Sequence, residues 1–315
     1  MPGQDDPVLV IGATGQQGGA AARALLERGR AVRAFVRDET KEAARQLCQA
    51  GASLVTGDLD DADSVLSAMQ SVSGVFLALT MMTGPRVTLA GVAAEERRGK
   101  AVAELARTAG IAHLVYSSIS SAPLHTGIPH VESKMRIEEH IRALGLPATM
   151  LRPVSFMDNF ASFTRPAVQA GELVVSLGLR PQTPLPLIAV RDIGTFAAIA
   201  FGDPGSYAGR HVDLAGDCLT GPQIADVFAR ATGLPARFRQ VPIEQLRAFD
   251  PEVARMFEWM DSRPSGESGL SIEPDLENLR AAHPGLMTLQ TWLQATRWRP
   301  EPPRQPAAAT GREAK

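Results

Sequence analysis

The sequence predicts an α/β protein, in which a doubly wound parallel sheet precedes a smaller C-terminal α/β domain. Three observations predict this fold class. Apolar strand patterns alternate with helix patterns through the first half of the 315 residues, as expected for a parallel sheet covered by helices. A glycine-rich turn joins the first strand to the first helix. Beyond Pro153, closely spaced prolines separate shorter elements, which indicates a change of architecture.

The first three elements form a βαβ unit around a glycine-rich loop. An apolar strand at Val8–Ile11 runs into this loop, an alanine-rich helix follows, and a second strand spans residues 31–36. Gly12 and Gly15 permit a tight turn whose backbone N–H groups can approach a pyrophosphate, and Gly18 lets the helix pack closely on the strand. A glycine-rich turn without a ligand is the alternative. The unit predicts a Rossmann-type dinucleotide site with these binding residues: Gly12, Ala13, Thr14, Gly15, Gln16, Gln17 and Gly18.

The end of the second strand bears on the choice of cofactor. The loop spacing GxxGxxG resembles that of extended and atypical short-chain dehydrogenase/reductases. Arg37 stands where NAD-selective sites carry an acidic residue for the ribose 2′-hydroxyl, and an arginine there can pair with a 2′-phosphate. We therefore expect NADP(H) in preference to NAD(H). Asp38 could instead accept a ribose hydroxyl, Arg37 could be a solvated surface charge, and Arg33 lies about 13 Å back along the strand.

The alternation of strands and helices continues to residue 153. We interpret residues 1–153 as an NAD(P)-binding Rossmann domain, whose ligand lies outside the carboxyl ends of the strands. Within one expected helix, Val102, Leu105 and Ala109 share a face at helical spacing. The expected strands are 53–56, 74–80, 111–117 and 148–153, and the expected helices are 41–50, 62–70, 95–109 and 131–143.

The second half predicts a smaller unit. We interpret residues 154–298 as a substrate or partner domain, with residues 185–202 returning to the first domain. The tail 299–315 is rich in proline, alanine and charge, so we expect it to be disordered. Polar caps are expected to open three helices: Asp192 for 190–201, Thr220 for 223–231 and Thr288 for 289–296.

Composition narrows the function classes. The net charge of −2 gives no overall attraction to nucleic acid or to anionic membranes, so we expect no direct nucleic-acid partner. The apolar stretch 185–201 is interrupted by Arg191 and Asp192, which argues against a membrane span. The two cysteines suit neither a disulfide framework nor a metal site, and the acidic start lacks a signal peptide's apolar stretch. We expect a cytoplasmic protein without a bound metal.

Several separated segments resemble the NmrA-like family of atypical short-chain dehydrogenase/reductases, which includes an NADPH sensor. The segments are residues 12–19, 55–60, 130–134, 151–159, 256–260 and 286–293. The resemblance implies an NADP(H)-binding Rossmann domain with a small C-terminal domain. It places Asp58 and Leu59 by the adenine and Lys134 by the nicotinamide ribose. It implies that four residues flank the nicotinamide: Phe156, Met157, Asp158 and Asn159.

Two of the expected cofactor contacts also follow from their place in the sheet. Asp58 follows one expected strand and can meet the adenine edge, while Thr80 ends the next and should border the pyrophosphate or ribose. A turn-forming aspartate and a capping threonine are the alternatives.

The catalytic residues are less evident. Short-chain dehydrogenases usually donate a proton through a tyrosine that precedes a lysine by four residues, and no YxxxK occurs here. His130 and Lys134 occupy the equivalent place on one helix face. Because Pro129 suggests a helix start, the positive helix end and Lys134 should keep His130 neutral and a reluctant proton donor. Ser118, at a strand end, could hydrogen-bond a substrate carbonyl, although serine is also common in turns.

Two functions remain open. One is an NADPH-dependent reductase acting on a small carbonyl- or quinone-type acceptor, with Lys134, His130 and Ser118 as candidate catalytic residues. The other is a non-catalytic NADP(H) redox sensor acting through a regulatory protein partner, which requires conformations of different nucleotide affinity. Either function is compatible with a homodimer. A basic cluster of Arg97, Arg98 and Lys100 could reach a cofactor phosphate, with a solvated helix face as the alternative.

Overall fold

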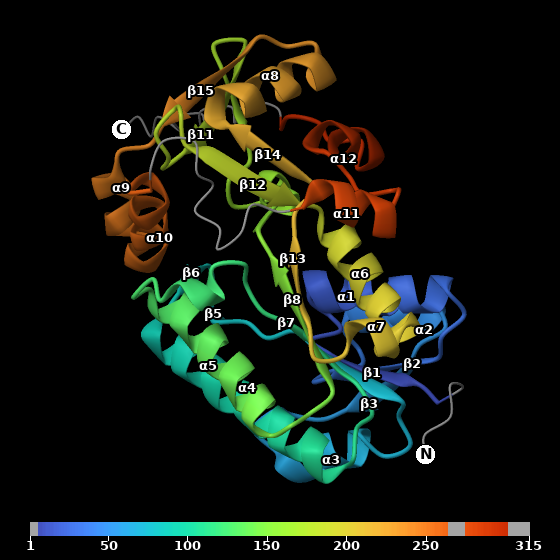
Figure 1. The fold of residues 1–315 in the computed structure, drawn as a ribbon. Coiled ribbons are helices and arrows are strands. Elements are labelled where there is room, and N and C mark those ends of the chain that lie inside the picture. Colours follow the sequence, from blue (N-terminus) through green and yellow to red (C-terminus); the bar gives the residue numbers. More distant parts are fainter. Residues whose placement is uncertain (1–5, 264–274, 302–315) are drawn as a thin grey trace, which may run out of the picture.

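A computed structural model describes residues 6–263 and 275–301. Parallel strands form the central sheet in the order β13-β8-β7-β4-β1-β2-β3 (Figure 1). The order reverses at β1 and β4, and doubly wound sheets bind their ligands outside the carboxyl ends of the strands at such a point. The predicted doubly wound Rossmann-type sheet is confirmed. Its strands are β1 (Val8–Ile11), β2 (Val32–Val36), β3 (Ser53–Thr56), β4 (Gly74–Leu77), β7 (Leu114–Ser117), β8 (Ala148–Pro153) and β13 (His211–Leu214).

Helices cover both faces of this sheet (Figure 1). One face carries α1 (Gln16–Glu27), α2 (Glu42–Gln49), α6 (Val190–Gly202) and α7 (Pro204–Tyr207). The other face carries α3 (Ala62–Ala68), α4 (Leu89–Thr108) and α5 (Pro129–Ala143). Helix α4 begins six residues earlier than expected, because the Thr88 hydroxyl accepts a hydrogen bond from the Gly91 N–H at 3.0 Å and caps it there.

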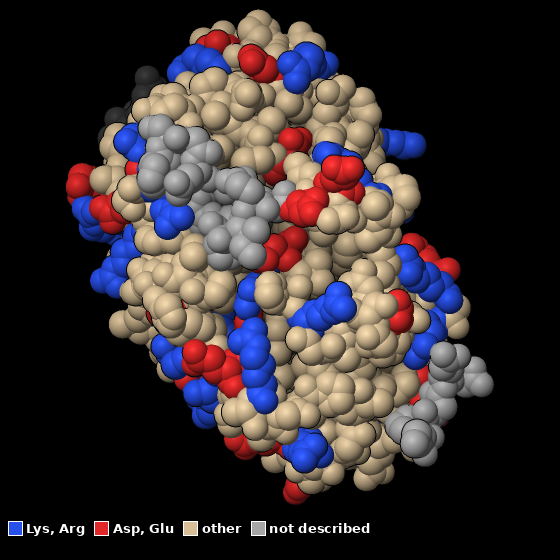
Figure 2. Space-filling model, in the orientation of Figure 1, with Lys and Arg blue, Asp and Glu red and all other residues tan. Residues whose placement is uncertain are grey.

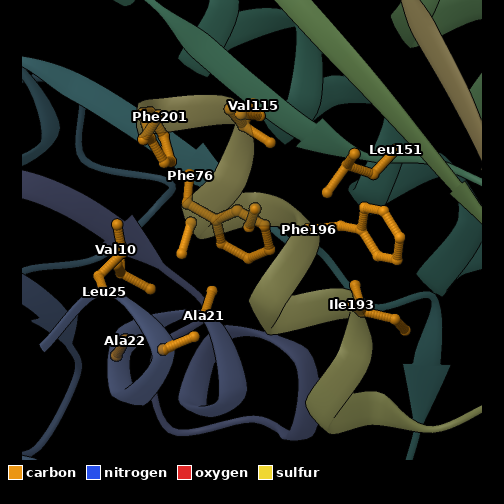
Figure 3. Close-up of a cluster of buried hydrophobic side chains, with 14 of the residues drawn as sticks. Val10, Ala21, Ala22, Leu25, Phe76, Val115, Leu151, Ile193, Phe196 and Phe201 are labelled. Carbon is orange, nitrogen blue, oxygen red and sulfur yellow. The ribbon is translucent and has the colours of Figure 1, made fainter. Parts of the chain in front are cut away.

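The central strands are buried on both sides, which explains their unbroken apolar sequences. In β1, Val8 and Val10 face the core beneath α1 and α6, whereas Leu9 and Ile11 face the core beneath α3, α4 and α5. Figure 3 shows the first of these cores, where strand residues meet two helices: Val10, Phe76, Val115 and Leu151 pack with Ala21, Ala22, Leu25, Ile193, Phe196 and Phe201.

Helix α6 comes from the second half of the chain but packs on the Rossmann unit. It lies directly against α1, where a Cβ on Gly194 would stand 2.4 Å from the Ala20 carbonyl oxygen. The expectation that Asp192 caps this helix is wrong, since Ala189 is the cap residue. Asp192 instead lies buried in the first turn, where its carboxylate contacts His283 at 3.0 Å and accepts the Met287 N–H at 2.9 Å. Its partners lie about ninety residues away, so local sequence could not reveal them.

The smaller unit contains two three-stranded sheets with helices around them (Figure 1). One sheet has the order β10 (Ala167–Gln169), β11 (Glu172–Leu177) and β15 (Ala236–Gln240); the other has β14 (Asp217–Thr220), β12 (Pro184–Ile188) and β9 (Ser155–Phe156). The helices are α8 (Gly221–Thr232), α9 (Ile243–Phe249), α10 (Pro251–Asp261), α11 (Leu276–Ala282) and α12 (Leu289–Ala295). The predicted caps of α8 and α12, Thr220 and Thr288, are confirmed, each within a capping box.

Short elements complete the described chain and link its two units. They are the hairpin β5 (Met82–Thr83) and β6 (Arg86–Val87) and the 3-10 turns η1 (Ala122–Leu124) and η2 (Met157–Ala161). The buried Asp250 carboxylate, at the start of α10, accepts the Val87 N–H at 2.9 Å and so ties the smaller unit to the hairpin.

The expected disordered tail falls largely outside the described residues. At its start, the Arg299 carbonyl accepts a hydrogen bond from Arg165 at 2.7 Å, and Glu301 pairs with the same arginine at 3.1 Å. Residues 302–315 are not described. Within residues 6–263 and 275–301, no helix combines the length and the apolar character needed to cross a membrane.

Candidate dinucleotide site

The glycine loop follows β1 and packs against the end of β4, and two of its glycines have no room for a side chain. Gly12 has a φ of +81°, and a Cβ there would stand 2.4 Å from the Ala78 carbonyl oxygen. A Cβ on Gly18 would stand 2.1 Å from the Gly12 oxygen. Helix α1 starts from the exposed Gly15 without a side-chain cap, so the N–H groups of its first turn can serve a ligand. This cradle fits the pyrophosphate of a dinucleotide.

Gln17 connects the loop to the neighbouring strand. Its side-chain oxygen accepts a hydrogen bond from the Ser117 hydroxyl at the end of β7, at 2.5 Å. Thr14 and Gln16 are exposed, whereas Ala13 is buried. The buried Ala13 and the hydrogen bond from Ser117 to Gln17 therefore fix the loop, while Thr14 and Gln16 stay open to solvent.

Beside β2, the charged candidates have different surroundings. The Asp38 carboxylate accepts hydrogen bonds from the Thr40 hydroxyl at 2.6 Å and the Thr40 N–H at 2.9 Å, which lower the pKa of Asp38. Arg33 donates to the Ala68 oxygen at 2.9 Å and the Gln70 oxygen at 2.6 Å, at the end of α3. Arg37 is exposed and has no hydrogen-bond or ion-pair partner among the described residues. Of the three, Arg37 is the group left open to an anion.

The loop after β3 is fixed by its own hydrogen bonds. The Asp58 carboxylate accepts the Asp60 N–H at 2.9 Å, which is turn geometry, and Leu59 packs partly buried against the core under α3 and α4. Two arginines of α4 bind Asp60: Arg97 at 2.9 Å, and Arg98 through two hydrogen bonds, one of them 2.9 Å. Their hydrogen bonds hold the pKa of Asp60 well below its ordinary value. Arg97 and Arg98 of the basic cluster are thus bound to this loop.

The segment after β4 differs from the expected strand. Strand β4 ends at Leu77, so Thr80 lies in the exposed turn beyond it. The Thr80 hydroxyl accepts the Met82 N–H at 3.1 Å, which shapes the entry to the β5–β6 hairpin. Lys100, the third member of the basic cluster, pairs with Glu96 at 2.7 Å.

His130 and Lys134 lie together inside the protein, on the first two turns of α5. Only 3% of His130 and 7% of Lys134 is exposed. The Lys134 ammonium donates to the Glu95 carboxylate of α4 at 2.7 Å, and the side chain of Glu95 is fully buried. Burial, and secondarily the Lys134 charge, lowers the pKa of His130 to about 4, so the ring is neutral at pH 7. The neutral ring was expected, but its main cause, burial, was not.

Ser118 lies deeper than a strand-end serine in contact with substrate would. It is 4% exposed and belongs to a buried polar group with Glu138 and Arg152. Burial raises the pKa of Glu138, but hydrogen bonds from Arg152, at 3.0 and 2.7 Å, outweigh it, so the net shift is downward. The Ser118 hydroxyl itself is buried and has no hydrogen-bond partner among the described residues.

Residues 156–159 connect the two units. Phe156 is half-buried at the end of β9, and Met157 is fully buried in the core of the smaller unit. Ala189 is the N-cap residue of α6, and the Asp158 carboxylate accepts the first N–H of the helix, that of Val190, at 2.9 Å, which is the contact expected of Asp192. The half-buried Asn159 presents its carbonyl to two N–H groups of the following turn. A cavity of about 300 Å³ between α1 and α6 is lined by both Gln16 and Asp158.

Glu95 is the site residue that sequence reasoning missed. A signal for it exists, because Glu95 shares helical spacing with the buried residues Val92, Gly99 and Val102 of α4. A glutamate on the apolar face of a helix is expected to have a buried partner. Because the sequence predicts a helix start at residue 95, Val92 falls outside the expected helix and the apolar face around Glu95 is incomplete.

The remaining features of the site region are metal-binding side chains and surface charge. In that part of the chain, His, Cys, Asp and Glu form no group of three or more placed to hold a metal. Figure 2 shows basic and acidic side chains interspersed over the face in view.

Comparisons with known proteins agree with this geometry. The NmrA-like family profile matches residues 4–293. The NmrA-like family domain-containing oxidoreductase FrzB of Cladobotryum sp is 29% identical over 264 residues, covering 77% of this chain and 78% of FrzB. NmrA, a negative transcriptional regulator solved with NADP, superposes with a TM-score of 0.76 at 22% identity, covering 92% of this chain and 94% of NmrA. The NADPH-dependent quinone oxidoreductase QOR2 of Escherichia coli, solved with NADPH, gives a TM-score of 0.74 at 19% identity, with 92% and 99% covered. At such identities the structural likeness shows the fold.

Proposed function

The chain belongs to the NmrA-like family, and from this premise we propose that it is an NADPH-dependent reductase of a small carbonyl- or quinone-type acceptor. The observation that carries the proposal is the glycine loop after β1, where Gly12 and Gly18 admit no side chain, together with Arg37, which has no partner among the described residues. The name of FrzB as an oxidoreductase and the quinone substrate in the name of QOR2 support it.

The proposed cofactor is NADP(H), in preference to NAD(H). The first-turn N–H groups of α1 would hold the pyrophosphate, and Arg37 would pair with the 2′-phosphate. Asp38, the alternative partner for a 2′-hydroxyl, already accepts two hydrogen bonds from Thr40. Lys134 would donate to the nicotinamide ribose. The remaining proposed contacts are Asp58 and Leu59 at the adenine, Thr80 at the pyrophosphate or ribose, and Phe156, Met157, Asp158 and Asn159 near the nicotinamide.

When bound, NADPH supplies a hydride, so the protein mainly needs to bind and orient. Neutral His130 can donate one hydrogen bond to an acceptor oxygen, and its Nδ1 has no hydrogen-bond partner among the described residues. Ser118 remains the proposed donor to the acceptor carbonyl, since its buried hydroxyl has no hydrogen-bond partner among the described residues. We assign residues 154–298, apart from α6, α7 and β13 of the Rossmann unit, to substrate or partner binding. From the two free cysteines we assign the protein to a reducing cytoplasm.

A redox sensor is the second candidate function. Its favouring observation is the neutral, buried His130 in a chain without YxxxK, which leaves proton donation weak. The regulator NmrA, solved with NADP, supports the same idea. The hydrogen bond between Asp250 and Val87 would connect nucleotide-dependent movement near β4 to the smaller unit.

NADPH consumption with a panel of quinones, aldehydes and dyes tests the proposal. We expect acceptor-dependent turnover that is lost in Lys134→Ala and retained in Lys100→Ala, a lysine paired on the outer surface of α4. Saturable NADPH binding without turnover would favour the sensor. Absence of NADPH binding would refute both.

A further inference from the structure

We propose that Glu95 is a positioning residue, which holds the Lys134 ammonium at the place where it meets the nicotinamide ribose. The inference rests on the proposed NADP(H) binding and extends it to a residue on a different helix. It follows from the buried contact between α4 and α5.

The geometry leaves Lys134 able to bind two partners at once. Its ammonium donates to one Glu95 oxygen at 2.7 Å, and the other Glu95 oxygen accepts the Ser133 hydroxyl at 3.3 Å. An ammonium has three N–H donors. Because Glu95 is the only partner of Lys134 within the described residues, two donors remain for ribose hydroxyls.

Among the described residues, the other carboxylates near this pair are already engaged: the Asp250 carboxylate, whose charge acts on His130, accepts the N–H groups of Val87, Glu252 and Val253. Glu138, one turn further along α5, is committed to Arg152 through two hydrogen bonds. Tyr116 lies close to both glutamates, and burial together with their charges raises the pKa of its hydroxyl, so it carries no charge. Glu95 therefore supplies the counter-charge for Lys134.

Because the Glu95–Lys134 ion pair is buried, breaking it has a large energetic cost. Removing one member of a buried ion pair leaves an uncompensated charge that the protein tolerates poorly. In Glu95→Gln, the Lys134 side chain should turn toward water or lose its proton, and in either case it leaves the ribose. Binding would weaken although Glu95 itself does not touch the nucleotide.

NADPH titration by calorimetry tests this. We expect Glu95→Gln to weaken NADPH binding about 10-fold or more, the effect of losing a hydrogen bond to a charged group. Glu96→Gln is the matched control: Glu96 is the next residue on α4 and pairs with Lys100 and Arg136 instead. The NADPH affinity of Glu96→Gln should stay within about twofold of wild type, since ion pairs nearer the surface contribute little stability. Equal losses in both variants would overturn the proposal.

A double-mutant comparison tests whether Glu95 acts through Lys134. If it does, Glu95→Gln has no further effect on NADPH affinity once Lys134→Met is present. Independent losses that add together would overturn the proposal. The double variant also removes both buried charges, so its fold should survive. Should Glu95→Gln alone not fold, Glu95→Asp, which keeps the charge but shortens the side chain, takes its place.

A nucleotide-free measurement separates this inference from the proposed function. Acetylation of Lys134 relative to the exposed Lys41, measured by mass spectrometry, should rise in Glu95→Gln and stay unchanged in Glu96→Gln. An unchanged Lys134 rate in Glu95→Gln would show that Glu95 does not hold the ammonium. Failure of wild-type protein to bind NADPH would defeat the proposed function and with it the ribose contact, while the acetylation result still decides the Glu95–Lys134 pair.

Discussion

Replacing Gly18 by alanine tests the packing that creates the pyrophosphate cradle. The new Cβ would stand 2.1 Å from the Gly12 carbonyl oxygen and 2.4 Å from its carbon, both backbone atoms that cannot rotate away. Gly19, the next residue of α1 and equally buried, is the matched control. There the nearest contact would be 3.2 Å from the Ala13 oxygen, which a small shift relieves.

The comparison of the two variants isolates the steric effect. Alanine in a helix is favoured over glycine by about 1 kcal/mol, and this gain is common to both positions. Overpacking at Gly18 costs about 1–3 kcal/mol. We therefore expect Gly18→Ala to be about 2 kcal/mol less stable than Gly19→Ala, which corresponds to about 3 °C in Tm for a chain of 315 residues.

Urea unfolding and NADPH titration measure both consequences. Because the added methyl at Gly18 must displace the Gly12 turn, NADPH affinity should fall together with the free energy of unfolding. Gly19→Ala should keep wild-type affinity. Equal free energies of unfolding for the two variants, or a more stable Gly18→Ala, would refute the reasoning.

Three further predictions concern charge. Arg37→Ala should weaken NADPH binding about 10-fold or more in calorimetry and leave NADH binding unchanged, and equal losses would contradict the 2′-phosphate role. The folded-state pKa of His130, about 4, lies below the ordinary 6.5, so unfolding takes up a proton between these values and stability falls as the pH drops. Between pH 7 and pH 5, urea unfolding should show that His130→Asn loses about 2 kcal/mol less free energy of unfolding than wild type does. Equal losses in the two proteins would contradict burial as the cause of the lowered His130 pKa. Asp192→Ala should destabilise by about 1–3 kcal/mol, because it strands the Met287 N–H and His283, and Asp192→Asn, which keeps one acceptor oxygen, should cost less in the same assay.

The fold of the first half was predictable because its signals are local. Strands buried on both faces have short apolar sequences. The three glycines of the loop are needed where β1, α1 and the end of β4 pack closely, so they mark that contact in the sequence. The smaller unit gave no such signal. Its strands pair across long separations, as when Leu173 of β11 lies beside Ala236 of β15, and nothing near either residue encodes that register.

The site shows the same division between local and distant information. The exposed loop residues and Arg37 were found from their places beside strands, whereas the partners that define the interior site come from elsewhere in the chain. Asp158 and Asp192 illustrate the difficulty. Both are acids near the start of α6, and the one 32 residues away in sequence accepts the first N–H of the helix, because the nearer one faces His283 inside the protein.

The interior of the site bears on which acceptors the protein can reduce. Hydride transfer to a simple aldehyde produces a localised alkoxide, which needs a proton donor close by. The chain has no YxxxK tyrosine, and His130, whose pKa is lowered to about 4, has no spare proton to give at pH 7 beyond its single N–H.

A quinone instead yields a delocalised phenolate-type anion, and a cationic dye yields a neutral product, so neither requires a proton during the transfer. The Lys134 ammonium, neutralised by Glu95, adds little positive charge to stabilise an alkoxide. The proposed reductase is thus better suited to quinones and cationic dyes than to aldehydes, and within the acceptor panel the order of turnover should follow the stability of the reduced product as an unprotonated species.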